Sequence, residues 1–292
     1  MPRTSAASPP AASEAKLATP WADDRAALRA ACEPGVGLCT VVGIDGSFSR
    51  RVGAQLAVGH DGAITGSLAD GCLEKQLASE IAEASGPVVK RYGAGSELID
   101  FRLPCGSGLD VLIDPAPDRE ACHAAITRLD VREVATLRLP SHEFPERRYI
   151  PALRLQLFGE GPELEALVAL AAAVGVDTAA HGKDALSLGR KPDTLAADPW
   201  TAVVLLFHDH EWEQAILEWA LETPAFFIGA QGGFEARRTR IERLADLGVP
   251  PVQQGRIRSP VGVITHSREP GVLALSVLAD IVGEYEALHP HG

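Results

Sequence analysis

The sequence predicts an α/β protein made of two domains, and three observations support this. Its 292 residues exceed what one hydrophobic core usually organises. In the second half, short apolar runs alternate with helical stretches, a rhythm typical of βαβ units and a doubly wound parallel sheet. In the first half, His60-Asp61-Gly62 separates two short apolar runs. Asp-Gly favours a tight hairpin turn, which indicates a mixed α+β domain.

The polar stretch 140–151, with three prolines, is the predicted linker. It separates an N-terminal domain at 21–139 from a C-terminal domain at 152–292. Residues 1–20 are rich in Ala, Ser and Pro and lack the apolar segment of a signal peptide. They predict a disordered tail on a cytoplasmic protein.

The composition excludes several classes of protein. A net charge of -12 argues against general nucleic-acid binding, which needs clustered Lys and Arg. No apolar run reaches the roughly 18 to 20 residues that cross a bilayer, so no membrane segment is expected. The five cysteines are an odd number without a CxxC pair, which argues against a disulfide framework or a zinc finger.

The pattern of apolar residues places each expected element in order. In the N-terminal domain we expect helices at 21–31, 72–84 and 117–128, with strands at 38–44, 55–58, 63–66, 88–92, 97–103, 109–113 and 131–139. In the C-terminal domain we expect strands at 152–158, 176–180, 200–207 and 225–229, with helices at 162–174, 211–221, 235–247 and 271–287.

The stretch 64–84 carries the candidate of most interest, Cys72. It lies in the first turn of a predicted helix, where Asp70 is the expected N-cap. A helix N-terminus favours the thiolate, the form that binds metals and attacks sulfur, while the nearby Glu74 opposes this. The alternative is a buried small residue. One face of this helix carries an apolar stripe of Leu73, Leu77 and Ile81.

Two other loops of the N-terminal domain are candidates. Cys105 follows Pro104 and precedes Gly106, which predicts a partly exposed thiol at a strand break. Soft metals and sulfur transfer both use thiolates, although a plain turn cysteine is the alternative. The loop 46–53, GSFSRRVG, offers hydroxyl, backbone and arginine donors suited to phosphate, with a solvated loop as the alternative.

The C-terminal domain carries a weak nucleotide signal. Residues 158–164, FGEGPEL, begin like the dinucleotide fingerprint with Gly159 and Gly161, but Leu164 replaces the third glycine. No carboxylate stands where the ribose is usually bound, so NAD(P) is not expected. His208 and Asp209 follow the most apolar strand and could bind a metal or cap the next helix.

The run from Cys39 to Glu74, CTVVGIDGSFSRRVGAQLAVGHDGAITGSLADGCLE, resembles the N-terminal domain of the XdhC/CoxI family. The segment 103–115, LPCGSGLDVLIDP, is similar to the family's second cysteine segment. The runs 201–209, 224–232 and 259–282 resemble its Rossmann-like C-terminal domain.

This resemblance implies an accessory protein for molybdenum hydroxylases of the xanthine dehydrogenase type. It implies a cytoplasmic, homodimeric chaperone rather than a turnover enzyme. Such a chaperone binds the molybdenum cofactor (molybdopterin) while a cysteine desulfurase supplies its terminal sulfur, and passes it to the apo-hydroxylase. Cys72 then becomes the reactive thiol and, with Cys105, a contact to molybdenum. The remaining candidate cofactor-binding residues are Gly46, Ser47, Arg50, Gly71, Glu74, Gly159, Gly161, His208 and Asp209.

The sequence departs from the family pattern in several places: Pro162 follows Gly161 where the family has histidine, the acidic run after the second Rossmann strand is missing, and two further departures affect candidate residues. Asp70 stands beside Cys72 where the family usually has glycine. The segment 232–237, GGFEAR, lacks two arginines of the family pattern, for which Arg238 or Arg240 could substitute, unless they lie on a solvated helix face. A pyridine-nucleotide oxidoreductase and a structural assembly factor without cofactor are the rival hypotheses.

Overall fold

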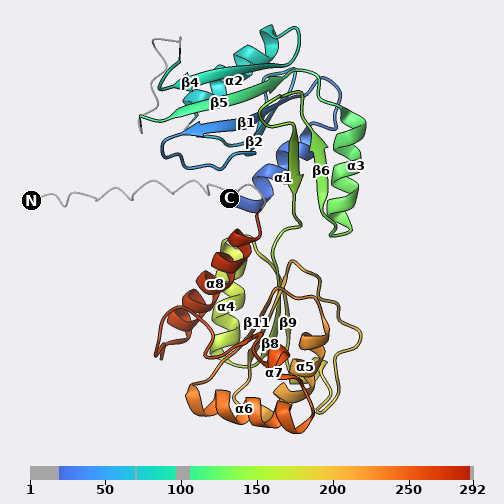
Figure 1. Cartoon of the computed structure of the whole chain (residues 1–292), viewed down its shortest axis with the longest axis vertical. Helices are drawn as coiled ribbons and strands as arrows, with labels where there is room; N and C mark the ends of the chain where they lie inside the picture. Colours follow the sequence, from blue (N-terminus) through green and yellow to red (C-terminus); the bar gives the residue numbers. More distant parts are fainter. Residues whose placement is uncertain (1–19, 70, 97–105, 290–292) are drawn as a thin grey trace, which may run out of the picture.

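The computed structural model describes residues 20–69, 71–96 and 106–289. It has two lobes, each built on one five-stranded sheet (Figure 1). The sheet of the N-terminal lobe is antiparallel and that of the C-terminal lobe is parallel. The predicted fold class is therefore confirmed. Among the described helices, none is both long and apolar enough to cross a membrane.

The N-terminal sheet has the order β3-β2-β1-β5-β4. Its strands are β1 (Gly37–Asp45), β2 (Gln55–Val58), β3 (Ile64–Gly66), β4 (Val88–Gly93) and β5 (Gly108–Asp114). Helix α2 (Cys72–Glu83) covers one face. The other face packs against α1 (Pro20–Ala30), α3 (Arg119–Asp130) and the hairpin of β6 (Ala135–Arg138) with β7 (Glu146–Tyr149). The side chains of β1 alternate accordingly, so that Cys39 packs on the α2 side and Leu38 on the other.

The structure differs from the sequence prediction around residues 131–151. The predicted strand 131–139 is reduced to β6, because the turn after α3 extends to Arg132, whose φ is 61°. The predicted linker contains β7, whose residues alternate between exposed and buried. The sequence of this strand, ERRY, contains two arginines. It therefore lacks the apolar pattern by which a strand is predicted. The predicted strand 97–103 lies outside the described residues.

The C-terminal sheet has the strand order β12-β11-β10-β8-β9 and all its strands are parallel. Its strands are β8 (Arg154–Gly159), β9 (Asp177–His181), β10 (Thr201–Leu206), β11 (Phe227–Ala230) and β12 (Ile257–Arg258). The predicted helices are α4 (Pro162–Ala173), α5 (His210–Glu222), α6 (Phe234–Asp246) and α8 (Pro270–Ala287), while the short η1 (Lys183–Ala185), α7 (Pro251–Gln254) and β12 were not predicted. The direction of strand addition reverses between β8 and β10, as in a doubly wound fold.

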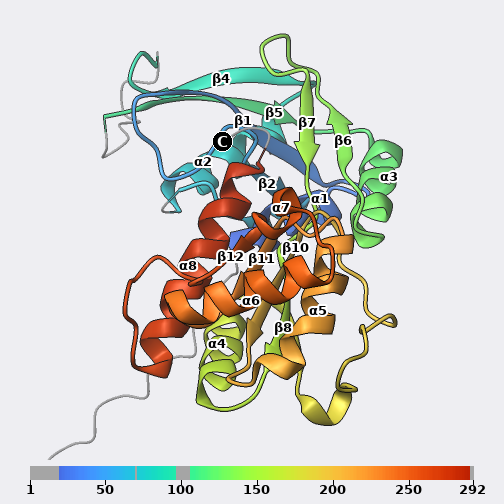
Figure 2. The ribbon, with the colours of Figure 1, turned by 60° about the horizontal axis from the view of Figure 1, so that its bottom comes forward.

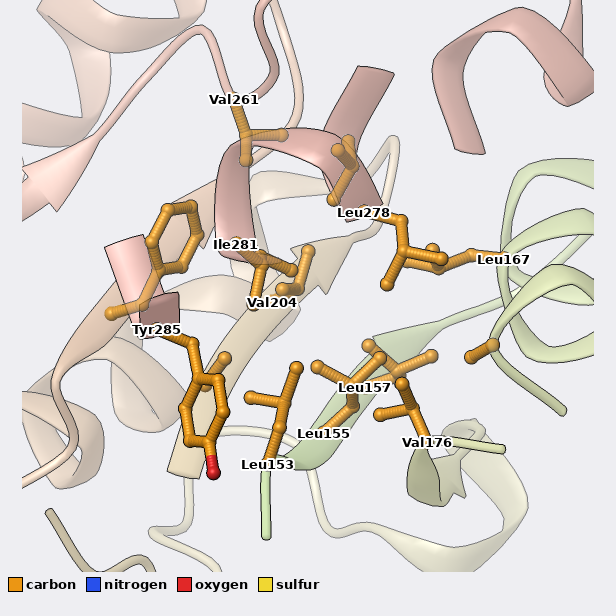
Figure 3. Packing of buried hydrophobic residues seen from close by; sticks show 14 of the residues in the cluster. Leu153, Leu155, Leu157, Leu167, Val176, Val204, Val261, Leu278, Ile281 and Tyr285 are labelled. Carbon is orange, nitrogen blue, oxygen red and sulfur yellow. The ribbon is translucent and has the colours of Figure 1, made fainter. Parts of the chain in front are cut away.

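Both faces of the parallel sheet are buried, which explains the unbroken apolar sequence of β10. Val203 and Leu205 pack with residues of α5 and α6. Val204 faces the opposite way, toward Leu167 of α4 and Ile281 of α8 (Figure 3). Strands buried on both faces are typical of parallel sheets covered by crossover helices.

Polar contacts join the two lobes near the C-terminal end of α8, which reaches the N-terminal lobe in both views (Figure 1, Figure 2). Arg51 pairs with Glu286 at 2.5 Å. Arg132 pairs with Asp198, which lies just before β10. Because β8 and β10 begin at this junction, their carboxyl ends lie at the far end of the parallel sheet. Six strand residues separate the two ends by about 20 Å.

Candidate functional site

Three segments of the N-terminal lobe come together near one edge of its sheet. β1 and β3 run in the same direction, and their carboxyl ends lead into the loops 46–54 and 67–71. β5 begins at this edge, where Gly108 pairs with Asp45. The topology therefore gathers most of the candidate residues of the N-terminal lobe, although they are far apart in the sequence.

Direct contacts hold these loops together. The Nε of Arg50 donates to the carbonyl oxygen of Ser67 at 3.1 Å. The hydroxyl of Ser107 donates to the carbonyl oxygen of Ser47. Gly46, with a φ of 87°, makes the turn that allows the second contact. Sequence reasoning missed Ser67 and Ser107. The signal that could have found Ser67 is its Gly-Ser pair, which repeats the Gly46-Ser47 pair.

Helix α2 begins at Cys72 and is preceded by Gly71 in the left-handed region, with a φ of 97°. Glycine adopts this conformation without the strain that a Cβ would add. Gly71 is the N-cap and no side chain caps the helix from that position, so the expectation that Asp70 is the N-cap is wrong. Asp70 and Cys105 themselves lie outside the described residues.

The carboxylate of Glu74 organises the loop before the helix. Its Oε1 accepts from the backbone N–H groups of Leu68 at 2.9 Å and Ala69 at 2.6 Å, and its Oε2 accepts from Gly71 N at 2.7 Å. The last contact is the reciprocal bond of a capping box, which the position of Glu74 three residues after Gly71 could have predicted. Glu74 is buried, so it positions the loop rather than facing a ligand.

The protonation of Glu74 follows from the same contacts. Burial alone would raise the pKa of its carboxyl, but the backbone N–H groups of Ala69, Leu68 and Gly71 outweigh burial and lower the pKa overall. The carboxylate form is therefore the one that holds loop 67–71.

Cys72 differs from the other described cysteines in its exposure. It is exposed, whereas Cys32, Cys39 and Cys122 are buried. Burial raises the pKa of the Cys39 thiol and raises that of Cys122 to about 12. The predicted helix stripe is confirmed beneath Cys72, because Leu73 and Leu77 are fully buried. Cys72 alone among these four thiols is placed to meet a ligand.

We expect brief treatment of the native protein with iodoacetamide to alkylate Cys72 well before Cys32, Cys39 or Cys122. The thiolate is the form that reacts, and burial hinders both its formation and the approach of the reagent. Mass spectrometry of proteolytic peptides measures the extent at each site, with denatured protein as the control for intrinsic reactivity. Equal alkylation of Cys72 and Cys122 in native protein would contradict the structure.

The candidates of the C-terminal lobe lie at the carboxyl ends of β8 and β10, on either side of the point where strand order reverses. A Cβ on Gly159 would lie 3.0 Å from the backbone carbonyl carbon and oxygen of Leu206, so only glycine fits there. Gly161 has a φ of 86° and begins α4. Asp209 caps α5 by accepting from the N–H of Glu211 at 3.0 Å, which agrees with the capping alternative.

The surroundings of these residues are acidic. The Nε2 of His208 lies 3.7 Å from Glu163 in the first turn of α4, and Lys183 pairs with Glu160 at 3.4 Å. Pro162 removes one backbone N–H from this helix start. A site for nucleotide phosphates needs free N–H groups and positive charge, and Pro162 and the carboxylates of Glu160 and Glu163 work against both at this helix start.

The arginines of α6 are engaged within the protein. Arg240 is buried and pairs with Glu213 at 2.8 Å, so the expectation of a solvated face is wrong for this residue. Arg238 is on the surface and pairs with Glu235 at 2.6 Å. Neither guanidinium is therefore left without a partner to replace the missing arginines of the segment 232–237.

The two groups of candidates do not meet. Loop 46–54 lies near the C-terminal end of α8, because Arg51 pairs with Glu286. The group around Gly159 and His208 lies at the opposite end of the parallel sheet. Within the described ranges, no cluster of three or more His, Cys, Asp or Glu side chains could hold a metal ion.

Comparison with known proteins identifies the family. Residues 29–93 match the model of the XdhC and CoxI family, and residues 155–281 match that of the XdhC Rossmann domain. The chain is 33% identical over 284 residues to the molybdenum cofactor insertion chaperone PaoD of Escherichia coli K12, across 89% of this chain and 88% of that protein. The chain belongs to the XdhC and CoxI family.

Two further proteins are similar to this chain. A protein of Bacillus subtilis named as a probable xanthine dehydrogenase subunit is 24% identical over 310 residues, covering 84% of this XdhC-family chain and 92% of that protein. The crystal structure of a xanthine dehydrogenase from Bacillus halodurans superposes with a TM-score of 0.69 at 21% identity. It covers 92% of this chain and 97% of that one. At this identity the structural match supports the two-lobed fold alone.

Proposed function

We propose that this protein binds the molybdenum cofactor at the edge of its N-terminal sheet and inserts it into a molybdenum hydroxylase of the xanthine dehydrogenase type. The cofactor is cargo in this proposal, which makes the protein a chaperone rather than a turnover enzyme. The observation that carries the proposal is the exposed Cys72 at the start of α2, beside a loop that Glu74 and Arg50 hold in place. The name of its relative, the insertion chaperone PaoD, supports it.

The donor set fits a molybdenum–pterin cargo. Sulfur is a soft ligand suited to a heavy transition metal, and the exposed Cys72 places a sulfur atom at the start of α2. Ser47 and Arg50 lie on the adjoining loop and supply donors for the phosphate of the pterin, a group that arginine binds well. Glu74 fixes the loop geometry from beneath. Cys105 is the second proposed thiol.

The wider features of the function are also proposals. A cysteine desulfurase would supply sulfur to the bound cargo, and two copies of the chain would form a homodimer in the cytoplasm. In the C-terminal lobe, Gly159, Gly161, His208 and Asp209 remain candidates for a separate contact with the cofactor.

Transfer to an apo-enzyme tests the function directly. The protein is purified from cells that make the cofactor and mixed with an apo molybdenum hydroxylase, and the recovery of hydroxylase activity is followed. We expect recovery with wild type and with Cys32→Ala, a thiol variant remote from α2, and little with Cys72→Ala. If the variant lacking both Cys72 and Cys105 still activates the hydroxylase fully, the protein is an assembly factor that does not handle cofactor through these thiols.

The oxidoreductase alternative makes a different prediction. It requires NAD(P) to bind at the carboxyl ends of β8 and β10, where the structure has Pro162 and acidic side chains. Calorimetry with millimolar NAD(P) is expected to give no binding heat. A saturable heat that His208→Ala abolishes would favour the oxidoreductase.

A further inference from the structure

A cavity of about 370 Å³ opens on the face of the N-terminal sheet opposite α2. It is bounded by side chains of β1 and β5, by Pro87, by the loop after β5 and by the end of β6. This volume lies within the usual range for small-ligand sites. Most of its lining is apolar, including Leu38, Leu112 and Leu137.

Strand register places two polar side chains in this lining. Leu38 pairs with Asp114, and Thr40 pairs with Leu112. The four side chains share one face of the sheet, because alternate strand residues point the same way. Thr40 and Asp114 are therefore diagonal neighbours, a relation that corresponds to about 7–8 Å between backbones.

Both polar groups retain hydrogen-bonding capacity. Asp114 is only 7% exposed, and its Oδ1 accepts from Ala116 N at 3.1 Å. Its Oδ2 has no hydrogen-bond donor among the residues that the structure describes. The Oγ1 of Thr40 accepts from the Nε2 of Gln55 at 3.0 Å, and no described group accepts its hydroxyl proton.

The carboxyl of Asp114 also lacks a counter-ion among the described residues that line the cavity. Burial raises the pKa of this carboxyl, and in the part of the chain that the structure describes only the hydrogen bond from the Ala116 N–H opposes that effect. The cationic side chain of this lining, Arg138, is 91% exposed and lies 4.0 Å from Glu146. Asp118, also in the lining, accepts from Ala121 N as the cap of α3. The balance of charge in the lining is therefore negative.

We propose that this cavity binds a guanidinium or amidinium group carried on an apolar body. The planar cation would donate to the Oδ2 of Asp114 and lie within reach of Thr40, while its apolar part contacts the leucines and prolines of the wall. Hydrogen bonds between such cations and a carboxylate are charge-assisted and stronger than neutral ones. The source is either a free small molecule or an arginine side chain of a bound peptide.

This site is distinct from the proposed cofactor site. Asp114 is the last residue of β5, whereas Gly108, at the cofactor edge, is the first. The strand separates them by about 20 Å, and the cavity lies on the opposite face from α2. Loss of ligand binding here would leave cofactor retention unchanged, so the two proposals can fail independently.

Titration with benzamidine, followed by NMR of the full-length protein, tests the site. We expect saturable binding at millimolar concentrations, with contacts between the benzamidine ring and the methyl groups of Leu38 and Leu137. Benzoate, with the opposite charge, is expected not to bind. Asp114→Asn keeps an acceptor for Ala116 and is expected to weaken binding at least about tenfold, the scale of one charge-assisted hydrogen bond. Glu120→Gln, on the exposed start of α3 and outside the cavity lining, is the matched control and is expected to bind as wild type.

A second titration separates the two sources. Acetyl-Leu-Arg-amide binding more tightly than benzamidine supports an arginine side chain, and the reverse supports a free small molecule. Absence of binding by both probes to wild type overturns the proposal, as does equal affinity in a folded Asp114→Asn variant. If that variant does not fold, the contacts between probe and leucine methyl groups in wild type decide the question.

Discussion

Replacing Arg240 by methionine is expected to lower the free energy of unfolding by about 3–5 kcal/mol, because the buried carboxylate of Glu213 loses its arginine partner and keeps only the His210 imidazole, 2.8 Å away. Arg240 donates to both oxygens of Glu213, at 2.8–3.1 Å, and to the hydroxyl of Ser259 at 2.7 Å. The side chains of Arg240 and Glu213 are each only 2% exposed. Urea denaturation followed by circular dichroism measures the loss.

Two variants control this prediction. Arg238→Met removes a guanidinium from the exposed side of the same helix, where Arg238 pairs with Glu235, and is expected to cost less than about 1 kcal/mol. The double variant Glu213→Leu with Arg240→Met removes both charges and is expected to recover much of the stability. The main cost of Arg240→Met is the burial of a carboxylate without its arginine partner. An equal effect of Arg238→Met and Arg240→Met would contradict the buried pair.

Replacing Glu74 by glutamine is expected to cost about 1.5–3 kcal/mol, the range for a hydrogen bond to a charged group. The amide has one acceptor oxygen, whereas the carboxylate accepts from three backbone N–H groups, those of Leu68, Ala69 and Gly71. Loop 67–71 should loosen, and cofactor retention should fall even though Cys72 is intact. Chemical denaturation and pterin content measure the two effects.

The pH dependence of the Glu74 effect has a defined sign. Because the pKa of Glu74 is lowered in the folded state, its contribution is fully present above the unfolded pKa of about 4.3. It is lost as the pH falls through the folded pKa. The difference in unfolding free energy between wild type and Glu74→Gln should therefore be largest at neutral pH and should disappear in acid. Glu83→Gln, at the exposed C-terminal end of the same helix, is the control and should show little difference at any pH.

The sequence predicted the C-terminal fold well, because buried strands and amphipathic helices leave strong apolar patterns. β10 is the clearest example, since all its residues are buried. The pattern of apolar residues did not predict the structure where a strand contains charged residues, some of them buried. β7 contains Arg147, which is 1% exposed and donates to Gly53 O at 2.7 Å. A pattern based on hydrophobicity assigns such a strand to a loop.

The sequence predicted which residues could form the candidate site, but not how the fold arranges them. The family pattern singled out Cys72, Arg50 and Gly71, and the structure places all three near one edge of the sheet. The family pattern could not show that Glu74 faces inward to hold the loop, because that role depends on the positions of backbone N–H groups, which cannot be read from the sequence. It also could not show that Arg240 is paired with Glu213, a residue 27 positions away.

The central claim is that the thiol of Cys72 holds the molybdenum cofactor, and pterin retention tests it most directly. Wild type, Cys72→Ala and Cys32→Ala are purified in parallel from cells that make the cofactor, and their pterin is oxidised and quantified by fluorescence per mole of protein. We predict that wild type and Cys32→Ala retain pterin and that Cys72→Ala loses most of it while remaining folded. Equal pterin in wild type and Cys72→Ala would contradict the claim.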